Sequence, residues 1–220
     1  MKNVKYIFFD IDHTISRSLF GYNRIGYFEY VLAGLLCKEQ NMSPAEAIEL
    51  TVEKENCFPG ADPFKAATEL GIPLRQYQQE LEAVQQKYLE VYEDAIELIA
   101  ALKAQKYELF ITSNNDQSRA RAVLVGAGLA DWNGHKYFTD TFGPDFTGCL
   151  KNSPEFFRKV ITEGGFDAER VLIIGDDLNC DRKIPAMAGI NNSILIDRNG
   201  ALEGNRVVTD LRGVLDVLEK

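Results

Sequence analysis

The chain has 220 residues, 45% of them hydrophobic and 26% charged, a composition typical of a globular protein and not of a disordered or fibrous one. Its 33 acidic and 24 basic residues give a net charge of −9, which repels phosphate backbones and argues against nucleic-acid binding. No apolar run approaches the roughly 20 residues that span a membrane, and no signal peptide is recognisable, so we expect a cytoplasmic protein with no membrane or nucleic-acid partner.

The first predicted element is a short strand at residues 4–9. Its sequence, VKYIFF, becomes continuously apolar toward its end, which is typical of a strand buried on both faces of a parallel sheet. Two aspartates, Asp10 and Asp12, follow it directly. The strand therefore presents two carboxylates at its carboxyl end.

Helical patterns dominate the next region, from about residue 19 to residue 92. Ser43, Pro44 and Glu46 form the signature of a helix start, with an N-cap, a first-turn proline and a capping-box acid. Residues 74–92 predict an amphipathic helix, and the sequence CFPGADPF before it predicts a loop. No strand pattern interrupts this region.

From about residue 94 to the end, predicted helices and strands alternate. This alternation favours an α/β fold with a doubly wound parallel sheet. The first strand lies some 80 residues before the others, so it joins the same sheet only if the helical region is an insertion. The predicted elements are a helix at 95–105, a strand at 107–112, a helix at 117–126 ended by glycine, an irregular stretch through 135–143, a helix at 154–163, a strand at 170–175, a short helix at 184–188 and a strand at 192–196.

Polar residues follow three of the predicted strands. In open parallel sheets, ligands bind outside the carboxyl ends of the strands, so these residues are expected to meet at one edge although they are far apart in the sequence. At least three carboxylates then lie close together. The residues are Asp10 and Asp12 after the first strand, Thr112, Ser113 and Asn114 after the second, and Asp176 and Asp177 after the third.

A cation is needed to offset carboxylates crowded in this way, because like charges raise one another's pKa and destabilise the fold. Oxygen ligands favour Mg²⁺ over zinc, and the four cysteines form no C-x-x-C pair. Magnesium commonly engages substrate phosphates, so the set predicts phosphoryl transfer. We expect Asp10 to attack phosphorus, and Asp12 to act as general acid and base while its backbone carbonyl ligates the metal.

These residues resemble the motifs of the haloacid dehalogenase-like hydrolases, in the same order and over nearly the whole chain. The first motif, D-x-D-x-T, corresponds to Asp10, Asp12 and Thr14. The second ends in a serine or threonine that holds the phosphoryl oxygens with neighbouring amides. It matches Ser113 in LFITSNN, with Asn114 after it, although Thr112 is an alternative.

The third and fourth motifs complete the resemblance. The third supplies a lysine that neutralises the phosphoryl and aspartate charges. It is similar to Lys151 in LKNSPEFF, although Asn152 replaces the usual proline. The fourth, G-D-x-x-x-x-D, matches GDDLNCD. It implies that Asp176 ligates the metal directly. Asp177 or Asp181 would contact the metal ligands without binding the metal, and Thr14 would have the same role in the first motif.

The resemblance implies a magnesium-dependent phosphatase that acts on a small phosphorylated metabolite through an aspartyl-phosphate. It also implies a Rossmann-like core formed by residues 1–16 and 94–220 and an all-helical cap formed by residues 17–93, hinged near residues 15–18 and 92–94. Family dehalogenases generally lack the second aspartate and the metal. A phosphosugar mutase and a non-catalytic phosphate-binding regulator remain alternatives, and the sequence identifies neither the substrate nor the oligomeric state.

Overall fold

The computed structural model describes residues 3–17 and 26–219. Its centre is a six-stranded sheet in the order β10-β9-β8-β1-β4-β7, in which every neighbouring pair is parallel. The predicted α/β class is therefore confirmed. The strands are β1 (Tyr6–Phe9), β4 (Glu108–Thr112), β7 (Asp140–Phe142), β8 (Val171–Gly175), β9 (Asn192–Ile196) and β10 (Val207–Val208).

The register of the three central strands explains where the site forms. Phe9 of β1 pairs with Ile111 of β4 and with Ile174 of β8. The next residue of each chain segment, Asp10, Thr112 and Gly175, therefore lies at the same level along the sheet. The polar residues that follow all three strands emerge side by side at the carboxyl edge, as the rule for parallel sheets predicts.

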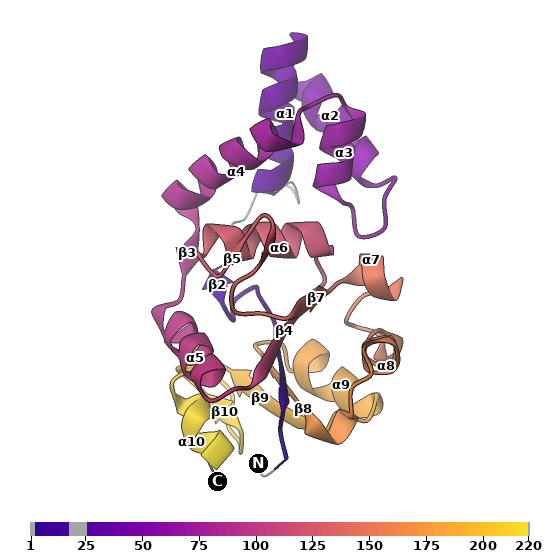
Figure 1. The fold of residues 1–220 in the computed structure, drawn as a ribbon. Helices are drawn as coiled ribbons and strands as arrows, with labels where there is room; N and C mark the ends of the chain where they lie inside the picture. Colours follow the sequence, from indigo (N-terminus) through magenta and orange to yellow (C-terminus); the bar gives the residue numbers. More distant parts are fainter. Residues whose placement is uncertain (1–2, 18–25, 220) are drawn as a thin grey trace.

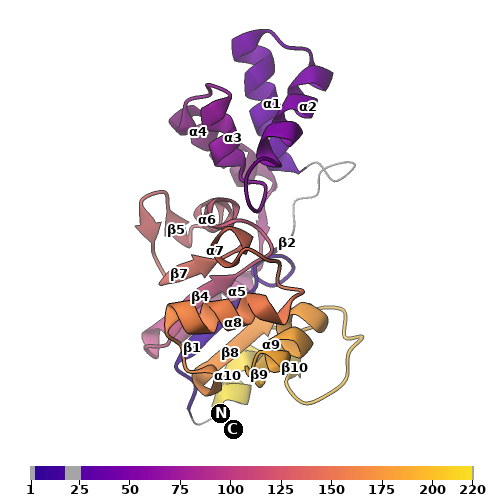
Figure 2. The ribbon, with the colours of Figure 1, turned by 90° about the vertical axis from the view of Figure 1, so that its right-hand side faces the viewer.

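Helices cover both faces of the sheet (Figures 1 and 2). Side chains alternate across β1, so Phe8 packs into an aromatic cluster on one face while Ile7 and Phe9 join the larger core on the other. The helices that follow or connect the strands are α5 (Glu93–Ala104), α6 (Gln117–Gly126), α7 (Pro144–Thr147), α8 (Pro154–Gly164), α9 (Ile184–Met187) and α10 (Gly213–Glu219), with a 3₁₀ turn at Ala168–Arg170, a π-helical turn at Asn179–Lys183 and a hairpin of β5 (Ala130–Asp131) and β6 (Gly134–His135).

The predicted helical insertion is present between β1 and α5, where the described residues form four helices: α1 (Tyr27–Gln40), α2 (Pro44–Glu55), α3 (Pro63–Glu69) and α4 (Leu74–Tyr88). They stand beyond the carboxyl edge of the sheet and lie over α6 (Figures 1 and 2). The predicted capping box at Ser43 is confirmed, because its side chain accepts from the Glu46 amide and Glu46 accepts from the Ser43 amide. Within the described ranges, no helix has both the length and the apolar character needed to cross a membrane.

Two short strands flank the insertion. Ser16–Arg17 (β2) and Glu90–Val91 (β3) form an antiparallel pair. β2 lies within the predicted hinge at 15–18, of which Ser18 is outside the described residues, and β3 directly precedes the predicted hinge at 92–94. The prediction that no strand interrupts residues 19–92 is therefore wrong at its end. The predicted helix at 74–92 stops at Tyr88, because residues 90–91 pair with β2 instead of continuing the helix.

Two further expectations from the sequence can be compared with the structure. The predicted bounds 117–126 of α6 are confirmed, but the left-handed glycine that terminates the helix is Gly128, with a φ of 70°. Gly128 and Leu129 then donate to the carbonyls of Val125 and Leu124, which is the Schellman arrangement. The stretch 135–143, expected to be irregular, contains the edge strand β7. No local sequence pattern predicts that this strand pairs with β4.

Candidate active site

The first motif begins where β1 leaves the sheet. The Asp10 amide still donates to the Ile174 carbonyl at 2.9 Å, which fixes Asp10 beside β8. The chain then turns sharply, with His13 at a φ of 61° and its amide donating to the Ser16 carbonyl. This turn leaves Asp12 half-buried and buries Thr14 completely beneath it.

Lys151 is buried and joins three of the predicted motifs. Its ammonium lies 2.6 Å from Asp10 Oδ1 and 2.8 Å from Asp181 Oδ1, and it donates to the Thr112 carbonyl at 3.0 Å. The Lys151 backbone amide donates to Asn114 Oδ1 at 2.8 Å. The predicted substrate-binding Asn114 thus holds the lysine loop in place through its side-chain oxygen.

The two hydroxyl candidates of the second motif occupy different places. Ser113 is only 2% exposed and lines a pocket at the carboxyl edge of the sheet. Thr112 is the last residue of β4; it is fully buried and does not line this pocket. Ser113 Oγ accepts a hydrogen bond from the Asn115 amide at 3.0 Å. Of the two residues, Ser113 is therefore the one whose hydroxyl borders the pocket.

The fourth motif separates Asp181 from Asp177. Asp181 is 1% exposed, and its Oδ2 accepts from the Asp177 amide at 3.1 Å while Oδ1 faces Lys151. The exposed Asp177 carboxylate instead accepts from the amides of Asn179 and Cys180, so it stabilises the turn. Asp181 is the one of the two that reaches the acidic cluster.

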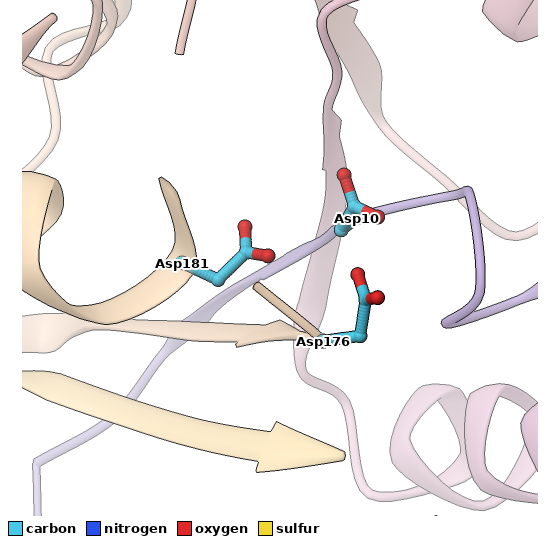
Figure 3. A group of neighbouring side chains, drawn as sticks. All are labelled: Asp10, Asp176 and Asp181. Atoms are coloured by element: carbon cyan, nitrogen blue, oxygen red, sulfur yellow. The ribbon is translucent and has the colours of Figure 1, made fainter. Parts of the chain in front are cut away.

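Three carboxylates converge at the carboxyl edge (Figure 3). Oxygen atoms of Asp10, Asp176 and Asp181 all lie within 4.8 Å of one another. The carboxylate of Asp12 is not a member of this group. The sequence prediction for Asp12 is that its backbone carbonyl, and not its carboxylate, ligates the metal. A pocket of about 220 Å³ surrounds the cluster and is lined by Asp10, Asp12, His13, Ser113, Asn114, Lys151, Asp176, Asp177, Cys180 and Asp181.

Burial and the neighbouring carboxylates raise the pKa of two aspartates in this cluster. Burial raises the pKa of Asp10 to about 8, and the carboxylates of Asp181 and Asp12 act in the same direction against the opposing charge of Lys151. Burial and Asp181 likewise raise the pKa of Asp176 to about 6. A divalent cation among these oxygens would relieve both effects, so the donor set fits Mg²⁺.

Sequence reasoning missed Arg198, which clamps the first-motif turn. Its guanidinium donates to the carbonyls of His13 and Thr14 and forms two hydrogen bonds, of 2.9 and 3.1 Å, with Asp94. It also lies 3.5 Å from the centre of the Tyr92 ring. Arg198 therefore connects the turn after β1 to the residues where the chain returns from the inserted helices.

The second missed residue is Asn115, whose side-chain amide donates to Asp12 Oδ2 at 3.2 Å. It directly follows the second motif, so its position alone could have drawn attention to it. Nothing in the sequence links it to Asp12, which lies 103 residues earlier. The same holds for Arg198 and Thr14, which are 184 residues apart.

The chain is similar in sequence to known hydrolases. A family model for haloacid dehalogenase-like hydrolases matches residues 4–189. A phosphoglycolate phosphatase from Rhodospirillum rubrum is 34% identical over 86 residues, and the putative HAD-hydrolase YfnB from Bacillus subtilis is 31% identical over 128 residues. These alignments cover 39% and 54% of this chain, and the chain spans only 34% and 52% of the two relatives.

Solved structures resemble the fold over nearly their full lengths. A HAD phosphatase from Thermococcus onnurineus has a TM-score of 0.61 at 23% identity, with 98% of each chain covered. YfnB from Bacillus subtilis, solved bound to magnesium, has a TM-score of 0.59 at 21% identity, with all of each chain covered. At these identities the likeness establishes a shared fold.

Proposed function

Because the chain belongs to the haloacid dehalogenase-like hydrolases, we propose that it is a magnesium-dependent phosphatase that hydrolyses a small phosphorylated metabolite. The observation that carries the proposal is the meeting of Asp10, Asp176 and Asp181 with the buried Lys151. This combination suits a doubly charged cation and a phosphoryl group held beside a carboxylate nucleophile. The phosphatase from Rhodospirillum rubrum, similar over part of the chain, supports a phosphate ester as substrate.

Mg²⁺ would be held by Asp10 and Asp176, with the Asp12 backbone carbonyl as a further ligand and Asp181 close by. When bound, it would neutralise the carboxylates and polarise a phosphoryl oxygen. Lys151 places a second positive charge against Asp10 Oδ1, which leaves the other oxygen of Asp10 available for attack. Ser113 and the neighbouring backbone amides would hold the phosphoryl oxygens, because Ser113 borders the same pocket.

Asp12 supplies the proton transfers in this proposal. As Asp10 attacks phosphorus, the bond from phosphorus to the leaving oxygen breaks, and the protonated Asp12 transfers its proton to that oxygen. The resulting carboxylate then accepts a proton from the water that attacks the aspartyl-phosphate. Phosphate and free Asp10 are released, and Asp12 is again protonated.

We also propose that residues 17–93 form a cap over a core made of residues 1–16 and 94–220. The antiparallel pair of β2 and β3 carries the chain between the two parts, and Arg198 holds both crossings on the core side. Closure of such a cap would exclude bulk water during transfer and place residues over the leaving group. The described residues that line the pocket around the acidic cluster all belong to the proposed core.

The direct test is phosphate release from a panel of phosphorylated metabolites and from p-nitrophenyl phosphate, with and without Mg²⁺. We expect hydrolysis that requires Mg²⁺ and that Asp10→Asn reduces by more than about a thousandfold, because the covalent step is lost. Asp216→Asn, at an exposed position of α10, is the matched control and should retain full activity.

Other outcomes would contradict the proposal in distinct ways. Isomerisation of a hexose phosphate without phosphate release would indicate a phosphosugar mutase. Metal-independent halide release from a 2-haloacid would indicate a dehalogenase. Binding of phosphate esters without turnover of any of them would indicate a non-catalytic regulator.

A further inference from the structure

Asn115 stands on a rigid support directly beside the proposed general acid. Its backbone amide donates to Ser113 Oγ, and its carbonyl lies so close to Gly143 that a Cβ there would be 2.4 Å away. The next residue, Asp116, is fully buried and caps α6 by accepting from the amides of Ser118 and Arg119. These contacts fix the backbone on both sides of Asn115.

Among the described residues, Asn115 Nδ2 donates a hydrogen bond to Asp12 Oδ2 alone, at 3.2 Å. Lys151, the cation of the cluster, is engaged elsewhere. Its ammonium donates to Asp10 Oδ1 and to the Thr112 carbonyl and forms an ion pair with Asp181 Oδ1. Among the described residues, Asn115 therefore supplies the neutral donor that orients Asp12.

An amide N–H can only donate a hydrogen bond. While Asn115 Nδ2 donates to Asp12 Oδ2, that oxygen is best suited to be the carbonyl oxygen of the neutral carboxyl group, because a carbonyl oxygen is a stronger acceptor than a hydroxyl oxygen. The contact therefore favours the proton on Oδ1. The hydrogen bond also opposes rotation of the carboxyl group, which would exchange its two oxygens.

We propose that Asn115 is a positioning residue that orients Asp12 for protonation of the leaving group. The inference rests on the proposed function, because it assigns the second-motif loop a part in the same reaction. Asn115 itself exchanges no proton. It acts by keeping the protonated oxygen of Asp12 turned toward the departing oxygen of the substrate while Asp10 forms its bond to phosphorus.

Leaving groups of different basicity test this role. An alkoxide, as released from a sugar or glycerol phosphate, is a strong base and must be protonated as it departs, whereas p-nitrophenolate is a weak base and departs without a proton. For Asn115→Ala we expect kcat/KM to fall by about 10- to 100-fold with an alkyl phosphate. With p-nitrophenyl phosphate it should stay within about threefold of the wild type.

Two further variants sharpen the test. Asn115→Asp keeps the shape but removes the donor, so it should show at least the same selective loss as Asn115→Ala. In an Asp12→Asn background, Asn115→Ala should have no further effect on the alkyl phosphate, because the group it positions is gone. Asn191→Ala, at an exposed asparagine whose side chain donates only to the Gly189 carbonyl, is the control and should show no selectivity.

The result that overturns the inference is an equal loss with both substrates, or additive losses of Asp12→Asn and Asn115→Ala. Either would mean that Asn115 only maintains the loop. Failure of the proposed function is separate and visible in the wild type, which would then hydrolyse neither phosphate ester.

Discussion

Gly175 illustrates how a missing side chain fixes the geometry of the acidic cluster. A Cβ at this position would lie 2.2 Å from Asp181 Cγ, far inside any contact distance. Asp181 cannot move away freely, since it is buried and is held by Lys151 and by the Asp177 amide. The glycine therefore allows the end of β8 and the fourth-motif turn to approach each other.

We expect Gly175→Ala to displace Asp181, to lower the free energy of unfolding by about 1–3 kcal/mol, and to reduce phosphatase activity about 10- to 100-fold. Gly34→Ala is the matched control, because nothing lies within 4 Å of its Cβ position in the middle of α1. That change should stabilise the protein by about 0.5–1 kcal/mol. Urea unfolding and phosphate release measure both, and wild-type activity in Gly175→Ala would refute the steric argument.

At this scale the sequence predicted the residues that follow strands and carry chemistry, and the structure brings Asp10, Asp12, Ser113, Lys151 and Asp176 into one pocket. It could not decide between Asp177 and Asp181, because that choice depends on how the turn at 179–183 folds back toward Lys151. Asn115 and Arg198 were missed for the same reason. Their partners are distant in the chain, and only the assembled sheet edge brings them together.

At the scale of elements, α2 shows what local sequence determines well. Ser43 and Glu46 satisfy each other's backbone amides at the start of the helix, as the capping-box pattern predicts. In contrast, β3 and β7 are two and three residues long and exist only through pairing with β2 and β4. Their formation depends on tertiary contacts, which the periodicity of hydrophobic residues in the sequence does not predict.

We expect Ser43→Ala to lower the free energy of unfolding by about 1 kcal/mol, because a helix N-terminal amide loses its acceptor. Ser43→Thr should lie within a few tenths of a kcal/mol of the wild type, because threonine retains the acceptor. Both variants should keep full activity, because Ser43 lies in the inserted helices and does not line the pocket around the acidic cluster. Urea unfolding followed by circular dichroism measures the difference, and equal stabilities for Ser43→Ala and Ser43→Thr would contradict it.

At the scale of the whole molecule, a buried ionic cluster joins the inserted helices to the core. Arg119 Nη2 of α6 lies 2.7 Å from Glu29 of α1 and 2.9 Å from Glu55 of α2, and it donates to the Ala61 carbonyl. Asp116 lies on the other side of the guanidinium, 3.2 Å from Arg119 Nε. Glu29 and Arg119 are 90 residues apart, so no local sequence pattern predicts this contact.

The two glutamates in this cluster differ in charge state. Burial raises the pKa of Glu55 to about 9, and the charge of Glu29 adds to the rise against the opposing effect of Arg119. Burial acts on Glu29 in the same direction, but its ion pair and hydrogen bond with Arg119 outweigh it, so the pKa of Glu29 is lowered. At neutral pH the cluster therefore contains a protonated Glu55 beside an ionised Glu29 that pairs with Arg119.

This arrangement predicts different effects for the two matched substitutions Glu55→Gln and Glu29→Gln. The folded pKa of Glu55 lies above its unfolded value of 4.5, so the folded state holds a proton that the unfolded state releases. The stability from this group is complete below the unfolded pKa and is lost as pH rises toward about 9. Glu55→Gln mimics the protonated form, so its Tm should fall less than that of the wild type between about pH 7 and about pH 9.

Glu29→Gln removes the ionised partner of Arg119 and should lower the free energy of unfolding by about 1.5–3 kcal/mol at neutral pH. Thermal unfolding of both variants and the wild type across this pH range is the measurement. Asp116, whose pKa burial raises to about 6, titrates mainly below the range. Asp10, whose pKa burial raises to about 8, titrates within it in both proteins, so the difference in slope between Glu55→Gln and the wild type reports on Glu55. If Glu55→Gln destabilised the protein as much as Glu29→Gln at neutral pH, Glu55 would be ionised there, and the α1–α2–α6 contact would depend on two ion pairs instead of one.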